Sequence, residues 1–240
     1  MSAFSESLSK AWELVLGADP VLLHTAGLSL FVSGSATIYA AVLGLALGAW
    51  LAVARFPGRR LLQGFMSTLL ALPSVVVGLV VYLLLSRSGP LGSWGILFTP
   101  QAMIFAQTFL VLPVIAALSQ QLVGDALREG GDQLRSMGAS RFTAACLMLL
   151  HERWAVLTIL LTAFGRAISE VGAVMIVGGN IDGLTRVITT TVALETSKGD
   201  LPLALALGLV LLGMVAVVNA LIAGVKTLQR RQGTQGRCQA

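Results

Sequence analysis

Five long apolar stretches alternate with polar segments along this chain of 240 residues. They cover roughly 21–54, 61–85, 101–122, 154–177 and 201–225. A helix needs roughly 20 mostly apolar residues to cross a bilayer, and each stretch reaches about that length. The pattern therefore predicts an all-α membrane protein with five transmembrane helices in a single domain, 1–240.

The overall composition indicates the same class. Hydrophobic residues make up 56% of the chain, charged residues make up 11%, and the mean hydropathy is +0.86. A soluble globular domain carries about 25% charged residues. The composition therefore excludes an ordinary soluble domain and predicts a multi-pass protein in contact with membrane lipid.

Basic residues are divided unevenly between the two sides that five spans define. The side of segment 124–153 has Arg55, Arg59, Arg60, Arg128, Arg135, Arg141, Arg153, Lys226, Arg230, Arg231 and Arg237. The opposite side has Lys10, Arg87, Arg186 and Lys198. Because cytoplasmic loops carry an excess of Lys and Arg, we predict that the N-terminus lies outside and that segment 124–153 and the C-terminus are cytoplasmic. The net charge of +5 then reflects orientation, and no nucleic-acid partner is expected.

Prolines and glycines inside these stretches modify the predicted helices. Pro73 and Pro113 each lack a backbone N–H donor, which bends a helix, and we expect a kink at both. Gly44 and Gly48 form a pair of small residues that lets another helix approach closely. The first span is therefore predicted to pack tightly against a second one.

Segment 124–153 is the longest polar interruption. Asp125 is a candidate N-cap, because its carboxylate can accept from the free N–H groups of a first helical turn. Gly138 tolerates the positive φ of a sharp reversal, and Ser140 is a candidate cap for a helix beginning at Arg141. The segment is predicted to form two short helices hinged at Gly138. Taken alone, a solvated connector between two spans explains it equally well.

The middle of this segment resembles the coupling loop of the permease subunits of ATP-binding-cassette (ABC) importers. That loop reads Glu-Ala-Ala, three residues, then Gly, often followed by Ala-Ser. Residues 138–141, Gly-Ala-Ser-Arg, match its second half. The first half departs from the pattern, because Asp132 replaces the Glu and residues 133–134 replace the two alanines. Further along, His151 replaces a proline of the family pattern. The resemblance implies contact with an ATPase subunit through Asp132, Leu134, Met137, Gly138, Ala139, Ser140 and Arg141.

Arg166 and Glu170 are two charged residues within the fourth stretch. Their spacing of four places them on one face of a continuous helix. Placing a charge in the middle of a membrane costs free energy, so both side chains are expected to face protein or water, and each other. Two interpretations stay open: a structural ion pair, or a gate or pathway lining.

Several segments resemble the molybdate, tungstate and sulfate branch of these permeases, and the tungstate-type subset in particular. The matching segments are 72–78, 166–167, 170–173, 178–181 and 189–200. The resemblance implies a type I ABC importer permease (MetI-like) fold and a homodimer in the cytoplasmic membrane of a prokaryote. It also implies an extracytoplasmic oxyanion-binding protein as a partner. Tungstate is the expected solute, and molybdate, sulfate or another solute is the alternative.

Polar residues follow the fourth stretch, toward the predicted outer side. Hydroxyl groups together with a cation can coordinate a tetrahedral oxyanion through several hydrogen bonds, although threonines are also ordinary in a half-buried segment. Our candidate pathway or gate residues are Arg166, Glu170, Asn180, Thr185, Arg186, Thr189 and Thr190.

Other classes of function leave different signatures. The chain has no P-loop pattern of Gly, four residues, Gly-Lys-Ser/Thr, so ATP and magnesium are expected in a partner subunit and not in this chain. It has no nucleophile–base pair, and its two cysteines, Cys146 and Cys238, give neither metal spacing nor a disulfide framework. We therefore do not expect an enzyme. A secondary transporter or a membrane scaffold without an ATPase partner remains the alternative class.

Overall fold

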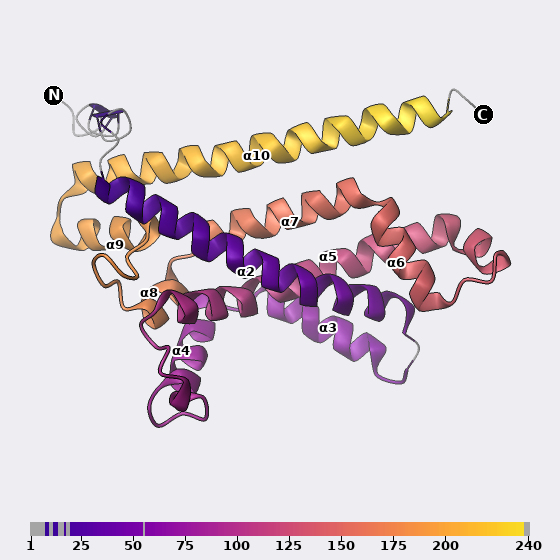
Figure 1. Ribbon diagram of the computed structural model, residues 1–240, viewed down its shortest axis with the longest axis horizontal. Helices are drawn as coiled ribbons and strands as arrows, with labels where there is room; N and C mark the ends of the chain where they lie inside the picture. The colour runs from indigo at the N-terminus through magenta and orange to yellow at the C-terminus, as the bar shows by residue number, and fades with distance from the viewer. Residues whose placement is uncertain (1–7, 10–11, 14–16, 18–19, 55, 238–240) are drawn as a thin grey trace. The chain divides into compact units, whose positions relative to one another are not determined.

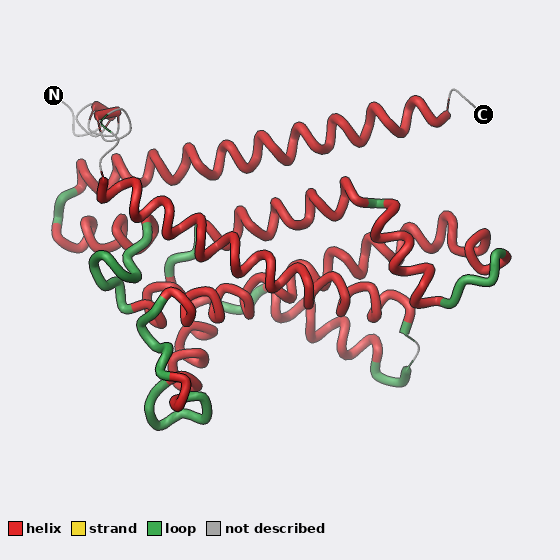
Figure 2. Tube along the Cα trace, in the orientation of Figure 1, coloured by secondary structure: helices red, strands yellow, loops and turns green. Residues whose placement is uncertain are grey.

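The computed structural model describes residues 8–9, 12–13, 17, 20–54 and 56–237. Every regular element in these ranges is a helix, which confirms the all-α prediction for them (Figures 1 and 2). The helices are α2 (Pro20–Val53), α3 (Arg59–Leu70), α4 (Ser74–Leu85), the 3₁₀ helix η1 (Gly92–Trp94), α5 (Pro100–Ser136), α6 (Arg141–His151), α7 (Arg153–Ile168), α8 (Gly172–Gly178), α9 (Ile188–Lys198) and α10 (Leu201–Arg237).

The chain divides into two compact units. Unit 1 contains Met1–Ala36, Pro73–Phe109 and Gly165–Val217, and unit 2 contains Thr37–Leu72, Leu110–Phe164 and Val218–Ala240. Helices α2, α5, α7 and α10 have residues in both units. Unit 1 holds the whole of α4, α8 and α9, and unit 2 holds the whole of α3 and α6.

Within the described residues, three helices are long and apolar enough to cross a membrane. They are Pro20–Val53, Pro100–Leu134 and Leu201–Thr227. Two pairs of shorter helices raise the number to five if each pair forms one span. These pairs are Leu61–Leu70 with Ser74–Leu85, and Arg141–His151 with Arg153–Ile168. The described part of the chain therefore has three to five candidate spans, as expected for a multi-pass membrane protein.

The second apolar stretch is divided. α3 ends at Leu70 and α4 begins at Ser74, so one helix does not cover 61–85. Pro73, with φ −63° and ψ 125°, directly precedes α4. Its ring fixes φ and removes a donor, and the helix ends and begins again here instead of only bending.

The third stretch continues well beyond its predicted end at 122. α5 runs to Ser136 and passes through Pro113, where we predicted a kink, without ending. Asp125 therefore lies inside a helix, and its predicted role as an N-cap is wrong. Instead, Asp125 Oδ1 accepts from Arg128 Nη1 at 3.1 Å on an exposed face of α5.

The fourth stretch is also divided. α7 ends at Ile168 and α8 begins at Gly172, so one helix does not cover 154–177. Glu170 lies in the break, and the prediction that Arg166 and Glu170 share one helical face is therefore wrong.

In unit 2, α2 packs on α5 through the predicted pair of glycines. A Cβ added at Gly44 would lie 2.9 Å from Ile115 Cβ, and one added at Gly48 would overlap Ser119 Oγ and lie 2.5 Å from Ala116 O. The Ser119 hydroxyl also donates to Gly44 O at 3.3 Å. The close approach that we predicted for these two glycines is confirmed.

A small apolar cluster joins three helices of the same unit. Ala49 of α2, Val123 of α5 and Ala145 of α6 are all buried in it. Leu127 and Leu149 pack against this cluster from α5 and α6. Helix α6 is therefore held on both α2 and α5 by contacts between small and aliphatic side chains.

In unit 1, α8 is held by close contacts that depend on glycine. A Cβ added at Gly78 of α4 would lie 2.7 Å from Ala173 Cα, a separation that real Cβ atoms essentially never show. A Cβ added at Gly172 would lie 2.8 Å from Val75 Cγ2. The backbone N–H of Phe98, in the loop before α5, donates to Val177 O at 3.0 Å. The short α8 is thus fixed against α4 and that loop.

Replacing Gly48 with Ala tests the α2–α5 contact. The added methyl overlaps Ser119 and the α5 backbone, and overpacking of this kind costs about 1–3 kcal/mol. We expect the purified Gly48→Ala protein to denature at a lower temperature in detergent. Gly34→Ala is the matched control, because a Cβ at Gly34 meets no atom within 4 Å. Equal stability of the two variants would contradict the close packing.

Candidate functional site

The turn between α5 and α6, residues 137–140, carries the resemblance to a coupling loop. Gly138 has φ +81°, so the predicted reversal at this residue is present. The Ala139 N–H donates to Leu134 O at 3.0 Å, which closes the end of α5. The Ser140 hydroxyl accepts from the Thr143 N–H at 3.2 Å, so Ser140 caps α6 as predicted.

Large apolar residues of this turn and of the start of α6 are exposed. Met137 is 78% exposed and Phe142 is 55% exposed, whereas Leu134, at the end of α5, is half-buried. A contiguous exposed apolar patch is typical of a protein interaction site, whereas single exposed apolar residues are common on any surface. These two residues therefore count as candidates together with the sequence resemblance of the turn. We did not predict Phe142. Its position directly after Arg141, at the start of a capped helix, is the signal that points to it.

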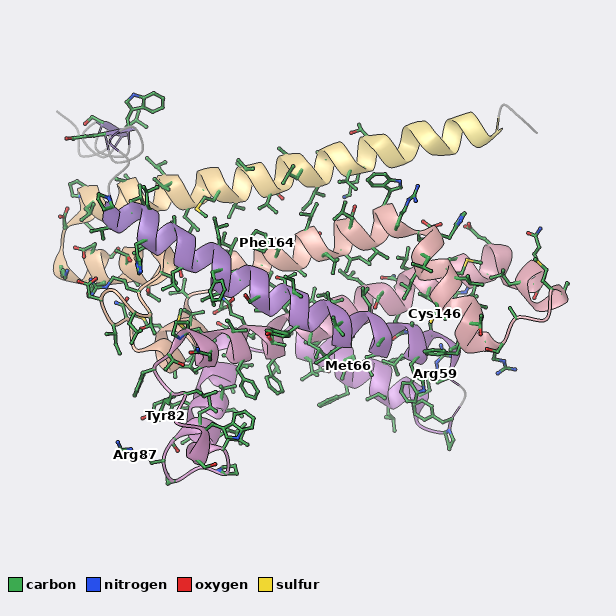
Figure 3. The ribbon with its side chains drawn as sticks, viewed as in Figure 1. Arg59, Met66, Tyr82, Arg87, Cys146 and Phe164 are labelled. Atoms are coloured by element: carbon green, nitrogen blue, oxygen red, sulfur yellow. The ribbon has the colours of Figure 1, made fainter. Side chains whose placement is uncertain are left out.

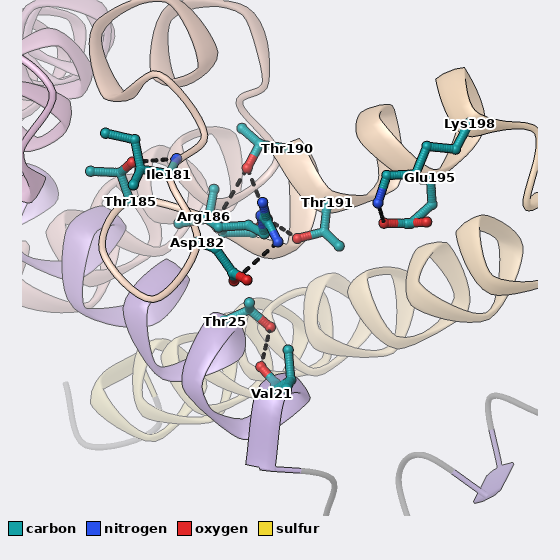
Figure 4. Close-up of polar contacts among 11 residues, drawn as sticks. Val21, Thr25, Ile181, Asp182, Thr185, Arg186, Thr190, Thr191, Glu195 and Lys198 are labelled. Carbon is teal, nitrogen blue, oxygen red and sulfur yellow. Dashed lines mark hydrogen bonds and ion pairs between the residues drawn. The ribbon is translucent and has the colours of Figure 1, made fainter.

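A second candidate site, in unit 1, is the loop between α8 and α9 (green in Figure 2). Thr185 is 1% exposed and joins the two ends of this loop (Figure 4). Its hydroxyl donates to Gly178 O at 2.6 Å and accepts from the Ile181 N–H at 2.9 Å. Gly179 and Asn180 both have positive φ, of 69° and 51°, so the chain reverses directly after α8.

Hydroxyl groups also fix the start of α9. Ser29 Oγ, from α2, accepts from the Ile188 N–H at 3.1 Å. Thr190 Oγ1 accepts from the Val187 N–H at 3.1 Å, and Thr189 Oγ1 donates to Glu170 O at 2.9 Å. The predicted pathway threonines thus bond to backbone groups, and oxyanion coordination by them stays a prediction.

Glu170 and Arg166 do not form the expected ion pair. Glu170 Oε1 accepts from the Ala173 N–H at 3.3 Å, at the start of α8. Arg166 is exposed at the end of α7 and has no ion-pair partner among the described residues. The break after Ile168 separates the two side chains, so Glu170 instead bonds to a backbone N–H at the beginning of the next helix.

A cavity of about 10 Å³ lies among α2, α5 and the α7–α8 break in unit 1. Its polar lining consists of Ser29, Ser33, Gln107, Glu170 and Thr189. Gln107 is 3% exposed, and its Nε2 donates to Ala167 O at 3.0 Å, while its Oε1 has no partner among the described residues. A volume of this size is close to that of one water, and a tetrahedral oxyanion needs more space.

Arg186 is the cation of the α8–α9 loop. Its Nη1 donates to Asp182 Oδ1 at 3.0 Å (Figure 4). Its Nε and the Asn180 Oδ1 are buried without a hydrogen-bond partner in the described part of the chain. The structure therefore brings Asn180, Thr185 and Arg186 together in one loop, and the carboxylate beside Arg186 offsets its charge.

Comparison with known proteins identifies relatives over almost the whole chain. The tungstate uptake system permease protein TupB of Peptoclostridium acidaminophilum is 43% identical over 222 residues, covering 92% of this chain and 97% of the relative. A probable anion ABC transporter permease protein of Haloferax volcanii is 42% identical over 221 residues, covering 90% and 94%. The sulfate transport system permease protein CysT of Escherichia coli is 29% identical over 234 residues, covering 95% and 83%. No family model matches the chain.

The apolar helices and these relatives together define a membrane transport permease. The chain belongs to the family of ABC importer permeases that includes the tungstate and sulfate permeases.

Replacing Thr185 with Val tests the loop between α8 and α9. Valine is close in shape but leaves Gly178 O and the Ile181 N–H unpaired, and each buried unpaired group costs about 1–3 kcal/mol. We expect lower thermal stability in detergent and faster proteolysis of the 179–187 segment. Thr196→Val is the control, because Thr196 is exposed and its hydroxyl donates to Val192 O in its own helix. Unchanged proteolysis of Thr185→Val would contradict this role.

Proposed function

We propose that this chain is the membrane-spanning permease subunit of an ATP-driven tungstate importer. The observation that carries the proposal is the 43% identity to a tungstate uptake permease along 92% of this chain. The aligned 222 residues extend over the polar helix breaks as well as the apolar spans. The sulfate permease relative is less similar, at 29% identity, so sulfate is the second candidate solute.

The proposal includes the assembly that such a permease requires. Two copies of this chain form a homodimer with a type I (MetI-like) fold, and the N-terminus lies outside. An extracytoplasmic binding protein delivers the oxyanion. Two ATPase subunits bind ATP and magnesium on the cytoplasmic side, since this chain has no P-loop. The uneven distribution of Lys and Arg supports this orientation.

Coupling to the ATPase takes place at the α5–α6 turn. Exposed Met137 and Phe142 fill an apolar groove on the ATPase, and Gly138 and Ser140 fix the angle at which α6 leaves the turn. Movement of the turn reaches α2 and α5 through the cluster around Val123 and Ala145. The supporting evidence is the exposure of these side chains together with the match to the family pattern at 138–141.

Replacing Met137 with Glu tests this coupling. Full burial of a Met side chain stabilises a complex by about 1.5–3 kcal/mol. Loss of this burial therefore weakens binding of the ATPase at least about tenfold. We expect tungstate accumulation by cells that depend on this permease to fall sharply, while the amount of permease in the membrane is unchanged. Co-purification of the ATPase measures the association directly.

Thr227→Glu is the matched control for that experiment. It adds the same charge at an exposed, already polar residue of α10, outside the segment that resembles the coupling loop. Loss of ATPase in Met137→Glu but not in Thr227→Glu is the expected result. Equal retention of the ATPase by both variants would contradict a coupling role for the turn.

A further inference from the structure

A large polar cleft lies between α3 and α5, within unit 2. Its volume is about 1000 Å³. Among the residues that line it, the polar ones are Arg59, Gln63, Gln120, Gln121, Asp125 and Arg128. None of them belongs to our predicted pathway or coupling residues. We refer to this space as the Arg59 cleft.

A second cavity, of about 270 Å³, shares Arg59, Gly124 and Arg128 with the Arg59 cleft and adds Arg141. The two adjoining spaces are therefore lined by Arg59, Arg128 and Arg141. Among their described lining residues, Asp125 supplies the one carboxylate. The local charge is positive, which favours an anionic occupant.

Arg59 is held in place before any ligand arrives. It lies at the start of α3, beside the end of α2 (Figure 3). Its Nε donates to Leu51 O at 3.0 Å and its Nη2 donates to Ala52 O at 2.9 Å. A guanidinium has five N–H donors, so three remain for a ligand in the cleft. A fixed, planar set of donors is well suited to a tetrahedral oxyanion.

Arg128 is available as a second cation. Its only ion-pair partner among the described residues is Asp125, at 3.1 Å, and the Arg128 side chain is 83% exposed. Exposed ion pairs contribute about 0–1 kcal/mol, so a doubly charged anion competes easily for Arg128. The guanidinium can therefore turn into the cleft without a large cost.

The glutamines of α5 add neutral donors to the same wall. The side-chain amides of Gln120 and Gln121 make no hydrogen bond to the described residues. Both residues lie within the candidate span Pro100–Leu134, where burying a polar group costs free energy unless the group faces water or a ligand. Their position in the cleft explains how this helix tolerates them.

We propose that the Arg59 cleft binds the free tetrahedral oxyanion on the same side of the membrane as the α5–α6 turn. This inference rests on the proposed function, which makes tungstate the ligand and this side the cytoplasmic one. Arg59 and Arg128 pair with the anion's oxygens, and Gln120 and Gln121 donate amide N–H groups to them. A lipid phosphate has the same tetrahedral shape, and Phe56, Leu61, Met66 and Leu70 give the cleft an apolar side as well. The experiment therefore distinguishes these two sources of a tetrahedral anion.

The test is equilibrium binding of sodium tungstate to the purified permease alone in detergent, without ATPase or binding protein. We expect the Arg128→Gln variant to bind tungstate at least about tenfold more weakly, with binding by the unaltered protein falling as salt is raised. Gln121→Leu keeps a helix-forming residue and is expected to bind more weakly as well. Arg87→Gln, at an exposed arginine outside the cleft, is the matched control and is expected to bind normally.

Three results would overturn the inference. The first is the absence of tungstate, molybdate and sulfate binding by the unaltered protein. The second is an equal loss of tungstate binding in Arg87→Gln and Arg128→Gln, which indicates non-specific attraction of the anion to basic residues. The third is that the protein binds phosphatidylglycerol but no inorganic oxyanion, and that Arg128→Gln weakens this lipid binding. That result identifies a lipid site.

The same experiment separates this inference from the proposed function. Binding of sulfate but not tungstate through Arg128 supports the oxyanion site and counts against tungstate as the solute. ATP-dependent tungstate uptake by a permease whose cleft binds no oxyanion leaves the proposed function standing and removes the inference.

Discussion

Backbone hydrogen bonding at helix ends is the constraint on which the rest of this structure depends. Lipid offers no partner for a free N–H or C=O group, and this chain interrupts its helices several times. Side chains supply the missing partners: Thr185 for Gly178 O and the Ile181 N–H, Glu170 for the Ala173 N–H, and Arg59 for two carbonyls at the end of α2. The same polar residues that resemble functional groups in the sequence are therefore largely occupied in holding the fold together.

Helix α5 connects the features to which we assign function in unit 2. It lines the Arg59 cleft with glutamines, packs on Gly44 and Gly48 of α2, and ends at the turn that carries Met137. Because α5 is one helix throughout this region, a displacement of the turn moves the wall of the cleft with it. In the proposed mechanism, α5 therefore links coupling to the ATPase with release of the anion from the cleft.

The sequence predicted features that depend on local chemistry. The close approach at Gly44 and Gly48, the reversal at Gly138 and the cap at Ser140 are all present, since each follows from one residue's size or hydrogen-bonding capacity. The break after Ile168 has no such signal. The residues that follow it, Gly172 and Ala173, pack against α4, a contact distant in sequence. Asp125 is not a cap because α5 continues through it. Its carboxylate instead accepts from Arg128 on the exposed face of that helix. The Arg59 cleft combines residues from α3 and α5 and could not be recognised from either alone.

The most direct test of the central claim is the ATPase activity of this permease reconstituted in lipid with its ATPase. It is measured with binding protein that is empty or loaded with tungstate, molybdate or sulfate. We expect hydrolysis to rise with tungstate-loaded binding protein and to stay near the basal rate with empty protein. Failure of any ATPase to assemble with the permease, or a rate that no loaded binding protein changes, would contradict the assignment as an importer subunit.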